Sequence, residues 1–326
     1  SSFVLLTFAR DSPQNRETIL AMGGVPAFVT LLKHHDDEIK LKSAEVINVF
    51  SADATGRNGL RGCAGTGALV QALGKAETAS GLQEHVVAAL ANLTTETDKK
   101  NLETLNEQGV LVTMCRLLSA PSSSDAVLQA ACFSIYNFSK SYRCKKDVLE
   151  AGAVTSLVPL LHQCPAAAAA ALCALSDDPR ARQLCDAKDG AGLGAVIQLL
   201  SHADESVRDQ AVVIVLNVCA ENEQYWDLFM QMGGLNALLT LAAHQSNSTA
   251  QLAAARELSR VSERKEYRGQ LQGESAQSYV VGLLLSGKEE LQRHIIRAVS
   301  NIASTPSCAK VGFCFISSQI YMYDFT

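Results

Sequence analysis

An apolar segment that carries a single asparagine recurs in most of the repeated units of this chain, which begin 39 to 45 residues apart. Helical solenoid repeats of about 40 to 47 residues have this spacing. One copy is DQAVVIVLNVCAEN at 209–222, in which the amide is Asn217. By itself this run fits either a buried strand or a buried helix. Other copies replace its valines with alanine, glutamate and arginine, which favours a helix. The asparagines of those copies are Asn48, Asn92, Asn137 and Asn301.

Each repeat has the same internal order. A short polar segment leads to a glycine, which ends a first helix in the left-handed conformation. A second, apolar helix follows, and after a polar loop comes a long third helix with the asparagine. The units begin near Gly23, Ala64, Gly109, Gly152, Ala191, Gly233 and Ala276. A stack of such units shares one continuous core, so the chain is predicted to be all-α.

This pattern resembles the armadillo repeat family. The resemblance implies a right-handed α-solenoid of about six repeats plus partial terminal units. We expect 1–22 to be the end of a truncated repeat, 23–312 to be the solenoid, and 313–326 to be a non-repeat tail. The resemblance also implies a non-enzymatic scaffold that binds extended peptide segments along a concave groove lined by third-helix asparagines.

Two units depart from the pattern. The fourth, 152–190, is shortened between its second and third helices and has Ala174 or Leu175 in place of the asparagine. The sixth replaces the asparagine with Arg260. We expect the fourth unit to divide the concave surface into two sections.

Composition narrows the function. A net charge of −5 argues against general nucleic-acid binding, which needs a basic face. The ten cysteines lie mostly in apolar runs without a CxxC pair, which is typical of reduced thiols in a cytoplasmic protein, or in a nuclear or cytoskeleton-associated one. The longest apolar run, 166–175, is about half of what a bilayer requires. We therefore expect no transmembrane segment.

Several motifs imitate ligand sites. The spacing GxxxxGK at 282–288 lacks the metal-binding Ser or Thr, and GAGLGA at 190–195 is read as a repeat glycine turn. Histidines recur near the ends of second helices, and one per unit is too sparse to share a metal ion, so helix capping is predicted. They are His35, His162, His202 and His244. No cofactor, metal or catalytic constellation is predicted.

The asparagine face is the candidate site. At 207–221, Val207, Ala211, Ile214 and Val218 form one helical stripe, and Gln210, Val213, Asn217 and Glu221 form the next. We expect the apolar stripe to enter the core. The amides then bind a peptide backbone, or they bind loop backbone within the solenoid, and both alternatives stay open. The predicted groove residues are Asn48, Asn92, Asn137, Phe133, Gln210, Asn217, Arg256, Arg260, Arg293, His294, Arg297 and Asn301.

The partner class is less constrained. The arginines of the last units suit acidic segments, although across 251–300 eight Lys and Arg are offset by six Glu, as on an ordinary charged helix face. A cargo adaptor similar to importin-α would need tryptophans one turn before the asparagines. The positions there are Ala44, Ala88, Phe133, Val213 and Arg297, and Trp226 lies outside the third helices. A further alternative is that the chain is a structural component of a cytoskeletal or axonemal assembly.

Overall fold

Helices make up all the regular secondary structure in the part of the chain that this computed structural model describes. That part comprises residues 12–74, 80–95, 99–182, 190–219, 222–243, 249–269 and 288–304, with Thr7, Leu271, Val280 and Leu284. It divides into two compact units, Ser1–Gln183 and Leu184–Thr326. Each unit is described by itself.

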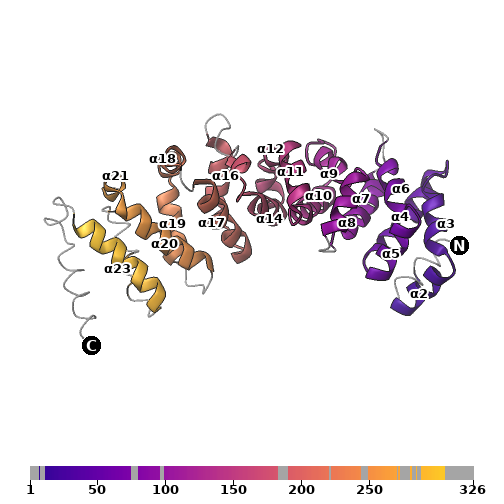
Figure 1. Ribbon diagram of the computed structural model, residues 1–326, viewed down its shortest axis with the longest axis horizontal. Coiled ribbons are helices and arrows are strands. Elements are labelled where there is room, and N and C mark those ends of the chain that lie inside the picture. Colours follow the sequence, from indigo (N-terminus) through magenta and orange to yellow (C-terminus); the bar gives the residue numbers. More distant parts are fainter. Residues whose placement is uncertain are drawn as a thin grey trace. The chain divides into compact units, whose positions relative to one another are not determined.

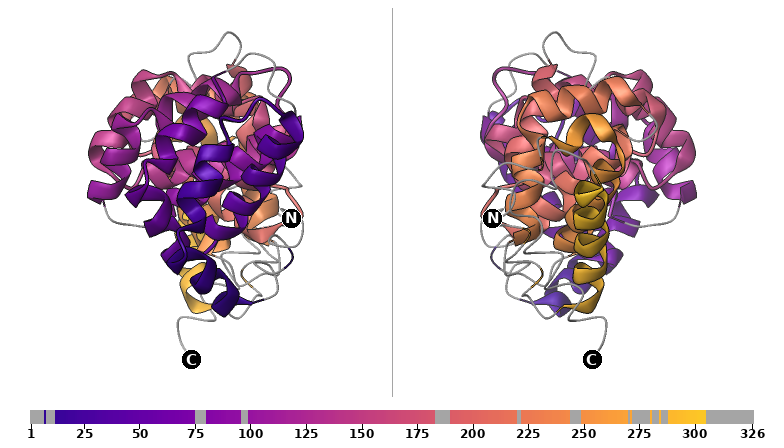
Figure 2. Two further views of the ribbon diagram at one scale, coloured as in Figure 1. Left: turned by 90° about the vertical axis from the view of Figure 1, so that its right-hand side faces the viewer. Right: turned by 90° about the vertical axis from the view of Figure 1, so that its left-hand side faces the viewer.

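The first unit contains four repeats of first, second and third helix (Figure 1). Its helices are α2 (Pro13–Ala21), α3 (Gly24–Leu31), α4 (Asp37–Ser51), α5 (Ala54–Gly62), α6 (Gly65–Ala72), α7 (Ser80–Leu93), α8 (Lys99–Glu107), α9 (Val110–Leu118), α10 (Asp125–Phe138), α11 (Tyr142–Glu150), α12 (Ala153–Leu157), α13 (Leu160–Gln163), α14 (Pro165–Leu175) and the 3-10 helix η1 (Pro179–Arg182). Viewed from the end that carries α2 and α3, the indigo helices of the first repeat lie in front of the magenta ones that follow (Figure 2, left).

The second unit has the same order of helices. It contains α16 (Ala191–Leu199), α17 (Glu205–Cys219), α18 (Glu223–Gln231), α19 (Gly234–Ala243), α20 (Thr249–Glu263), α21 (Lys265–Arg268) and α23 (Glu289–Ala303). In both units each third helix packs against the next: α4, α7, α10 and α14 in the first, and α17, α20 and α23 in the second.

A left-handed residue starts the second helix of each described repeat. These residues are Gly23, Ala64, Gly109, Gly152, Gly190 and Gly233, with φ between 55° and 84°. Five of these residues are the same as predicted unit starts, and Gly190 is the neighbour of the predicted Ala191. A side chain rarely adopts this conformation because its Cβ meets the following carbonyl. Ala64, with φ of 55°, is the non-glycine exception among the described residues.

The core is built from the apolar stripes of the third helices. Val207, Ala211, Ile214 and Val218 are all completely buried, which confirms that this stripe of α17 enters the core. Aliphatic residues supply most of the buried side chains, and burial of such groups is the main favourable term in stacking the repeats.

The fourth repeat differs in its second and third helices. Pro159 has no N–H to donate and interrupts the second helix between α12 and α13. The chain then passes from α13 to α14 through Cys164 alone, so the polar loop of the other repeats is missing here. The predicted shortening of this repeat thus removes the loop and brings Cys164 to the start of α14.

Some predictions fall outside the described residues. These are the unit start at Ala276, His244, Glu221, the tail 313–326, most of the 282–288 motif, and residues 1–6 and 8–11 of the 1–22 segment. In the described part of the chain, every helix is too short or too polar to cross a lipid bilayer.

Candidate functional site

The third helices share one position near their C-terminal ends, which we call the rung position. It is flanked by a buried apolar residue two places before it and another one place after it. Around Asn92 these are Leu90 and Leu93, and around Asn137 they are Ile135 and Phe138, all completely buried. By the same flanks the rung positions are Val49, Asn92, Asn137, Ala174, Asn217, Arg260 and Asn301.

This register corrects the expected alignment of the first copy. Ile47 and Phe50 are both completely buried, so the residue between these flanks that occupies the rung position is Val49. Asn48 lies one residue earlier, on the neighbouring side of the helix. In the fourth repeat the same flanks are Leu172 and Leu175, which assigns the rung position to Ala174 rather than to Leu175.

Rung asparagines bond to the preceding repeat. The Nδ2 group of Asn92 donates to Ser51 Oγ at 2.9 Å, that of Asn137 to Thr94 Oγ1 at 3.1 Å, and that of Asn301 to Ser262 Oγ at 3.0 Å. Each hydroxyl in turn donates to a carbonyl of its own helix, so its proton is already used and it accepts the amide. These amides therefore join successive third helices. One of the two alternatives was a bond to loop backbone within the solenoid. For these three amides the partner within the solenoid is a side-chain hydroxyl.

Asn137 is the most enclosed of these amides. Its residue is only 2% exposed, and its Oδ1 accepts a hydrogen bond from Lys140 Nζ at 2.8 Å. Lys140 is held over the ring of Tyr136, with Nζ 4.4 Å from the ring centroid. In this conformation the Asn137 amide is buried, and both its Nδ2 and its Oδ1 have hydrogen-bond partners within the protein.

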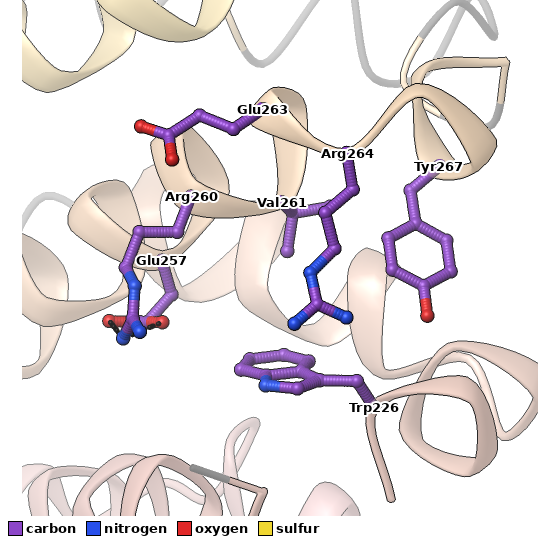
Figure 3. Close-up of a pocket in the computed structure, with 7 residues that line it drawn as sticks. All are labelled: Trp226, Glu257, Arg260, Val261, Glu263, Arg264 and Tyr267. Atoms are coloured by element: carbon purple, nitrogen blue, oxygen red, sulfur yellow. Dashed lines mark hydrogen bonds and ion pairs between the residues drawn. The ribbon is translucent and has the colours of Figure 1, made fainter. Parts of the chain in front are cut away.

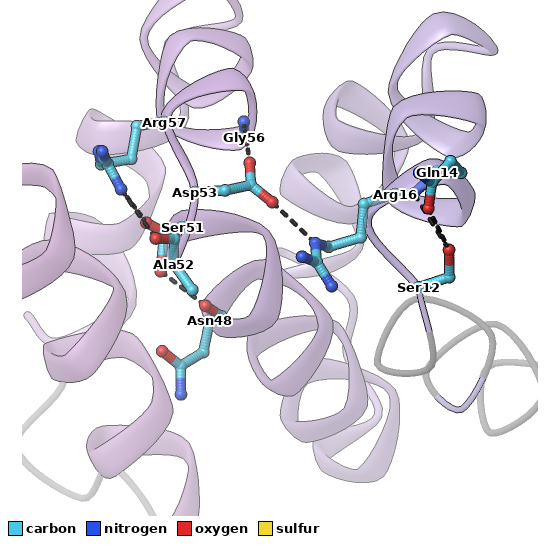
Figure 4. Close-up of polar contacts among 9 residues, drawn as sticks. All are labelled: Ser12, Gln14, Arg16, Asn48, Ser51, Ala52, Asp53, Gly56 and Arg57. Atoms are coloured by element: carbon cyan, nitrogen blue, oxygen red, sulfur yellow. Dashed lines mark hydrogen bonds and ion pairs between the residues drawn. The ribbon is translucent and has the colours of Figure 1, made fainter.

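Asn48 and Asn92 are half-buried and lie in a polar cluster on α4 and α7. Asn48 Nδ2 lies 3.5 Å from His85 Nδ1, and Asn92 Nδ2 lies 3.5 Å from Asn48 Oδ1. Figure 4 shows the Asn48 amide directed away from Ser51, whose hydroxyl bonds the Asn48 carbonyl. The same figure shows Arg16 reaching Asp53 at 2.7 Å, a contact between the first helix of one repeat and the N-cap of the next first helix.

Two large apolar side chains are exposed one turn before the rung position. Phe133 is 42% exposed and Val213 is 39% exposed, although both are large and apolar. Gln210 donates to Ser206 Oγ at 3.5 Å, and its Oε1 is buried without a hydrogen-bond partner. The exposure of Phe133 and Val213 supports their predicted orientation, because these side chains are not part of the core.

The predicted basic residues of the second unit are paired with carboxylates. Glu257, which is completely buried, lies 3.1 Å from Arg260 Nη1 and 3.6 Å from Arg256 Nε. Arg297 Nη2 lies 2.6 Å from Glu263, and this is an ion pair between α23 and α20. Arg293 Nη2 lies 2.6 Å from Glu289 on its own helix, and His294 beside it is half-buried.

A small pocket of about 160 Å³ adjoins Arg260. Its lining residues come from α18, from the end of α20 and from α21, and they are Trp226, Glu257, Arg260, Val261, Glu263, Arg264 and Tyr267. Figure 3 shows the Arg264 guanidinium beside the Trp226 ring. Sequence reasoning missed these neighbours of Arg260. The sequence did contain one signal for them. Each first helix follows directly after a third helix, as α21 follows α20, so residues of the first helix lie near the C-terminal end of that third helix.

Two histidines accept backbone N–H groups just before a third helix, whereas His162 lies in the last turn of α13, as predicted for the histidine column. His202 Nδ1 accepts the N–H of Asp204, just before α17, at 3.0 Å, and His34 rather than His35 does the same for Asp36 before α4. His34 and His202 therefore help to order the turn into a third helix. The described residues contain no group of three or more His, Cys, Asp or Glu side chains placed to hold a metal ion. Gly190, in the GAGLGA motif, is the left-handed residue that starts α16.

Comparisons with known proteins agree with the repeat architecture. The family model described as the plant U-box protein ARM repeat region matches residues 4–254. No curated protein shows a significant match to the chain.

Solved structures are similar in fold. One engineered protein superposes with a TM-score of 0.71 at 24% identity, covering 94% of this chain and 74% of its own. A computationally designed armadillo repeat protein for modular peptide recognition gives a TM-score of 0.58 at 23% identity, covering 65% and 90%. A designed armadillo repeat protein in complex with the peptide (KR)4 gives 0.57 at 19% identity, covering 85% and 99%. The fold is therefore an all-α armadillo repeat solenoid, as the sequence predicts.

Proposed function

Because this chain belongs to the family of plant U-box protein ARM repeat regions, we propose that it is a non-enzymatic scaffold that binds extended segments of other proteins along its third helices. One observation carries the proposal. On the third-helix face that holds the rung residues, large apolar side chains, Phe133 and Val213, stay exposed one turn before the rung position. Exposed apolar side chains beside polar groups are typical of binding surfaces.

In the first unit, Phe133 and the Asn48–His85–Asn92 cluster supply complementary groups. An extended peptide presents backbone donors and acceptors along one edge and side chains at alternate positions. The half-buried amide of Asn48 offers both a donor and an acceptor to such a backbone, and Asn92, whose Nδ2 already donates to Ser51 and Asn48, offers its carbonyl oxygen. Phe133, on the third helix that follows, offers a surface for an apolar side chain. In this proposal Asn137 contributes only after Lys140 has moved.

In the second unit, charge selects the segment. Arg256, Arg260 and Arg297 have side chains more than half exposed, and these three guanidinium groups share two carboxylates, Glu257 and Glu263. The excess positive charge favours an acidic segment, as expected from the sequence. Arg293, His294, Asn217, Gln210 and Asn301 remain proposed members of this surface.

The test starts from a peptide selected against the purified chain from a library of random displayed peptides. Replacing Phe133 with serine should weaken binding of that peptide roughly 10-fold, because aromatic anchors are usual hot spots. The matched control is Val112→Ser on α9, a second-helix residue that is 65% exposed. Fluorescence anisotropy gives both affinities, and melting curves check the fold. Equal losses in the two variants would contradict the proposal.

A second comparison separates acidic from basic partners. Glutamate-rich peptides and (KR)4 are titrated into the wild type and into the Arg256→Glu, Arg260→Glu double variant. The proposal expects the wild type to prefer the acidic peptide and the variant to lose that preference. Preference for (KR)4, the peptide bound by one of the designed armadillo repeat proteins, would favour the cargo-adaptor alternative, which requires recognition of basic segments. Binding of neither peptide would favour a structural component of a larger assembly. The cytoplasmic location stays a prediction.

A further inference from the structure

In two repeats of the first unit, the fourth residue of the first helix is a cation that pairs with a carboxylate of the next repeat. Arg16, the fourth residue of α2, lies 2.7 Å from Asp53, the N-cap of α5 (Figure 4). Lys145, the fourth residue of α11, pairs with Asp177, which follows α14. Each ion pair joins a first helix to the repeat that follows it.

The second unit has different residues at the corresponding positions. The fourth residue of α18 is Trp226, and the N-cap of the next first helix, α21, is Arg264. Both side chains line the pocket of about 160 Å³ beside Arg260. At these two positions the second unit therefore has a cation and no carboxylate.

Arg264 is a half-buried cation without an ion pair. Among the described residues no carboxylate pairs with its guanidinium, and its side chain makes no hydrogen bond to cap α21. The two carboxylates that line the pocket are held by other arginines. Glu257 pairs with Arg256 and Arg260, and Glu263 pairs with an arginine of α23. A partly desolvated cation without a counter-ion favours an anion from outside the chain.

Trp226 adds a second unused donor. The residue is 6% exposed and packs edge-on against Phe229, with ring centroids 5.4 Å apart. Within the part of the chain that the structure describes, its indole N–H has no hydrogen-bond partner. Figure 3 shows the Arg264 guanidinium beside the ring, and the indole nitrogen on the side of the ring nearer to Arg260. Indole and guanidinium groups only donate hydrogen bonds, so the pocket requires a ligand that accepts them.

Charge and size narrow the ligand further. Around the pocket the arginines outnumber the carboxylates, even when Asp227, which accepts a hydrogen bond from the Tyr267 hydroxyl, is counted. Guanidinium groups bind carboxylates and phosphates through pairs of parallel hydrogen bonds. The volume of about 160 Å³ is below the roughly 300 to 1,000 Å³ of typical small-molecule sites, so it suits one side-chain group.

We propose that this pocket is a subsite for one oxyanion, the carboxylate or phosphate of a side chain in the bound segment. Arg264 and the Trp226 N–H bind the oxygens in the place where Asp53 lies in the first unit. Arg260 lines the pocket and occupies the rung position, so a segment on the third helices can reach it. The inference rests on the proposed function, because that segment carries the oxyanion.

Trp226 is the single tryptophan of the 326-residue chain, so its fluorescence reports on the pocket directly. The wild-type protein is titrated at constant ionic strength with the N-acetyl amides of phosphoserine, glutamate and serine. We expect a saturable change with phosphoserine, with glutamate or with both, and none with serine. The tighter of the two anions identifies phosphate or carboxylate as the preferred group. The absence of a saturable change with either anion overturns the proposal, and this measurement requires no variant to fold.

Variants assign the donors, with affinities measured by calorimetry and folding checked by melting curves. Arg264→Gln should weaken binding of the tighter anion roughly 10-fold, because a charge-assisted pair is lost. Trp226→Phe keeps a ring but removes the N–H, and should weaken binding roughly 3-fold. The matched control is Arg293→Gln on α23, outside the pocket, which should bind as the wild type does. Wild-type affinity in Arg264→Gln or in Trp226→Phe, or an equal loss in Arg293→Gln, overturns the proposal.

The selected peptide separates this inference from the proposed function. If the peptide binds and the small anions leave the Trp226 fluorescence unchanged, the scaffold proposal stands and the subsite proposal fails. If the anions bind in the pocket and no peptide binds, the pocket still takes oxyanions and the scaffold proposal fails.

Discussion

Asn137 in the first unit and Arg260 in the second occupy the same rung position but use it in opposite ways. Asn137 is 2% exposed and bonds the third helix before it. The Arg260 side chain is 62% exposed and bonds Glu257 on its own helix. One position therefore serves as an internal cross-link in one repeat and as charged surface in another.

The preceding helix explains the difference. The residue that would receive the rung amide is two places after the rung position of the repeat before it. For Asn137 that residue is Thr94, whose hydroxyl accepts the bond. For Arg260 it is Cys219, and a thiol is a weak acceptor. The hydrogen bond at the rung position is therefore specified by two residues in successive repeats and not by the asparagine alone.

The largest effect is expected from removing the buried rung. Asn137→Ala deprives the Thr94 hydroxyl of its donor and Lys140 of its acceptor, and should lower the free energy of unfolding by about 2 kcal/mol. Urea denaturation measures this change. Arg260→Ala should lower the free energy of unfolding by less, about 1 kcal/mol at most. The Arg260 side chain is exposed, and Glu257 still has its ion pair with Arg256 in this variant. If the two substitutions cost the same, burial of the rung does not distinguish the units.

A smaller effect is expected from building a rung in the second unit. Cys219→Ser together with Arg260→Asn supplies a hydroxyl and an amide in the places that Ser262 and Asn301 occupy one repeat later. A double-mutant cycle should give a favourable coupling of about 1 kcal/mol. The control cycle pairs Cys219→Ser with Arg256→Asn, one turn earlier on α20, and should show no coupling. Equal coupling in both cycles would refute the rung geometry.

The smallest effects are expected in the pH dependence of stability, to which one group in each unit contributes. In the first unit the Arg180 guanidinium donates two hydrogen bonds to Asp178 and the Arg180 backbone N–H donates a third, and these bonds lower the pKa of this carboxyl to about 2. In the second unit, burial and the hydrogen bond from the Tyr267 hydroxyl to Asp227 raise the pKa of Tyr267 to about 12. The two groups therefore act at opposite ends of the pH scale.

The signs follow from linkage. Asp178 has a folded pKa below its unfolded value of about 3.9, so its contribution is present above that pH and is lost as the pH falls from about 4 to 2. Tyr267 has a folded pKa above its unfolded value of about 10, so its contribution is present below that pH and is lost as the pH rises from about 10 to 12. Melting curves of Asp178→Asn and Tyr267→Phe should each flatten only the corresponding limb. Flattening of the opposite limb would contradict the assignment.

Much of the fold could be predicted because its signals are local. The turn glycines were recognisable since few other residues adopt positive φ, and the stripe from Val207 to Val218 was recognisable from helical spacing. The register of Asn48 was not, because the segment from Ile47 to Phe50 is apolar on both sides of the amide. Only packing shows that Val49 lies in the rung position.

The sequence by itself determined a helical repeat, its glycine turns, its buried stripes and the outlying fourth and sixth units. These depend on residues within one or two helical turns of each other. Tertiary structure alone decided that the rung amides bond hydroxyls of the preceding repeat, and that Trp226 and Arg260 line the same pocket. The physical reason is that these partners come from different helices, often a whole repeat apart. Only the stacking of helices brings such residues together, and no local periodicity records it.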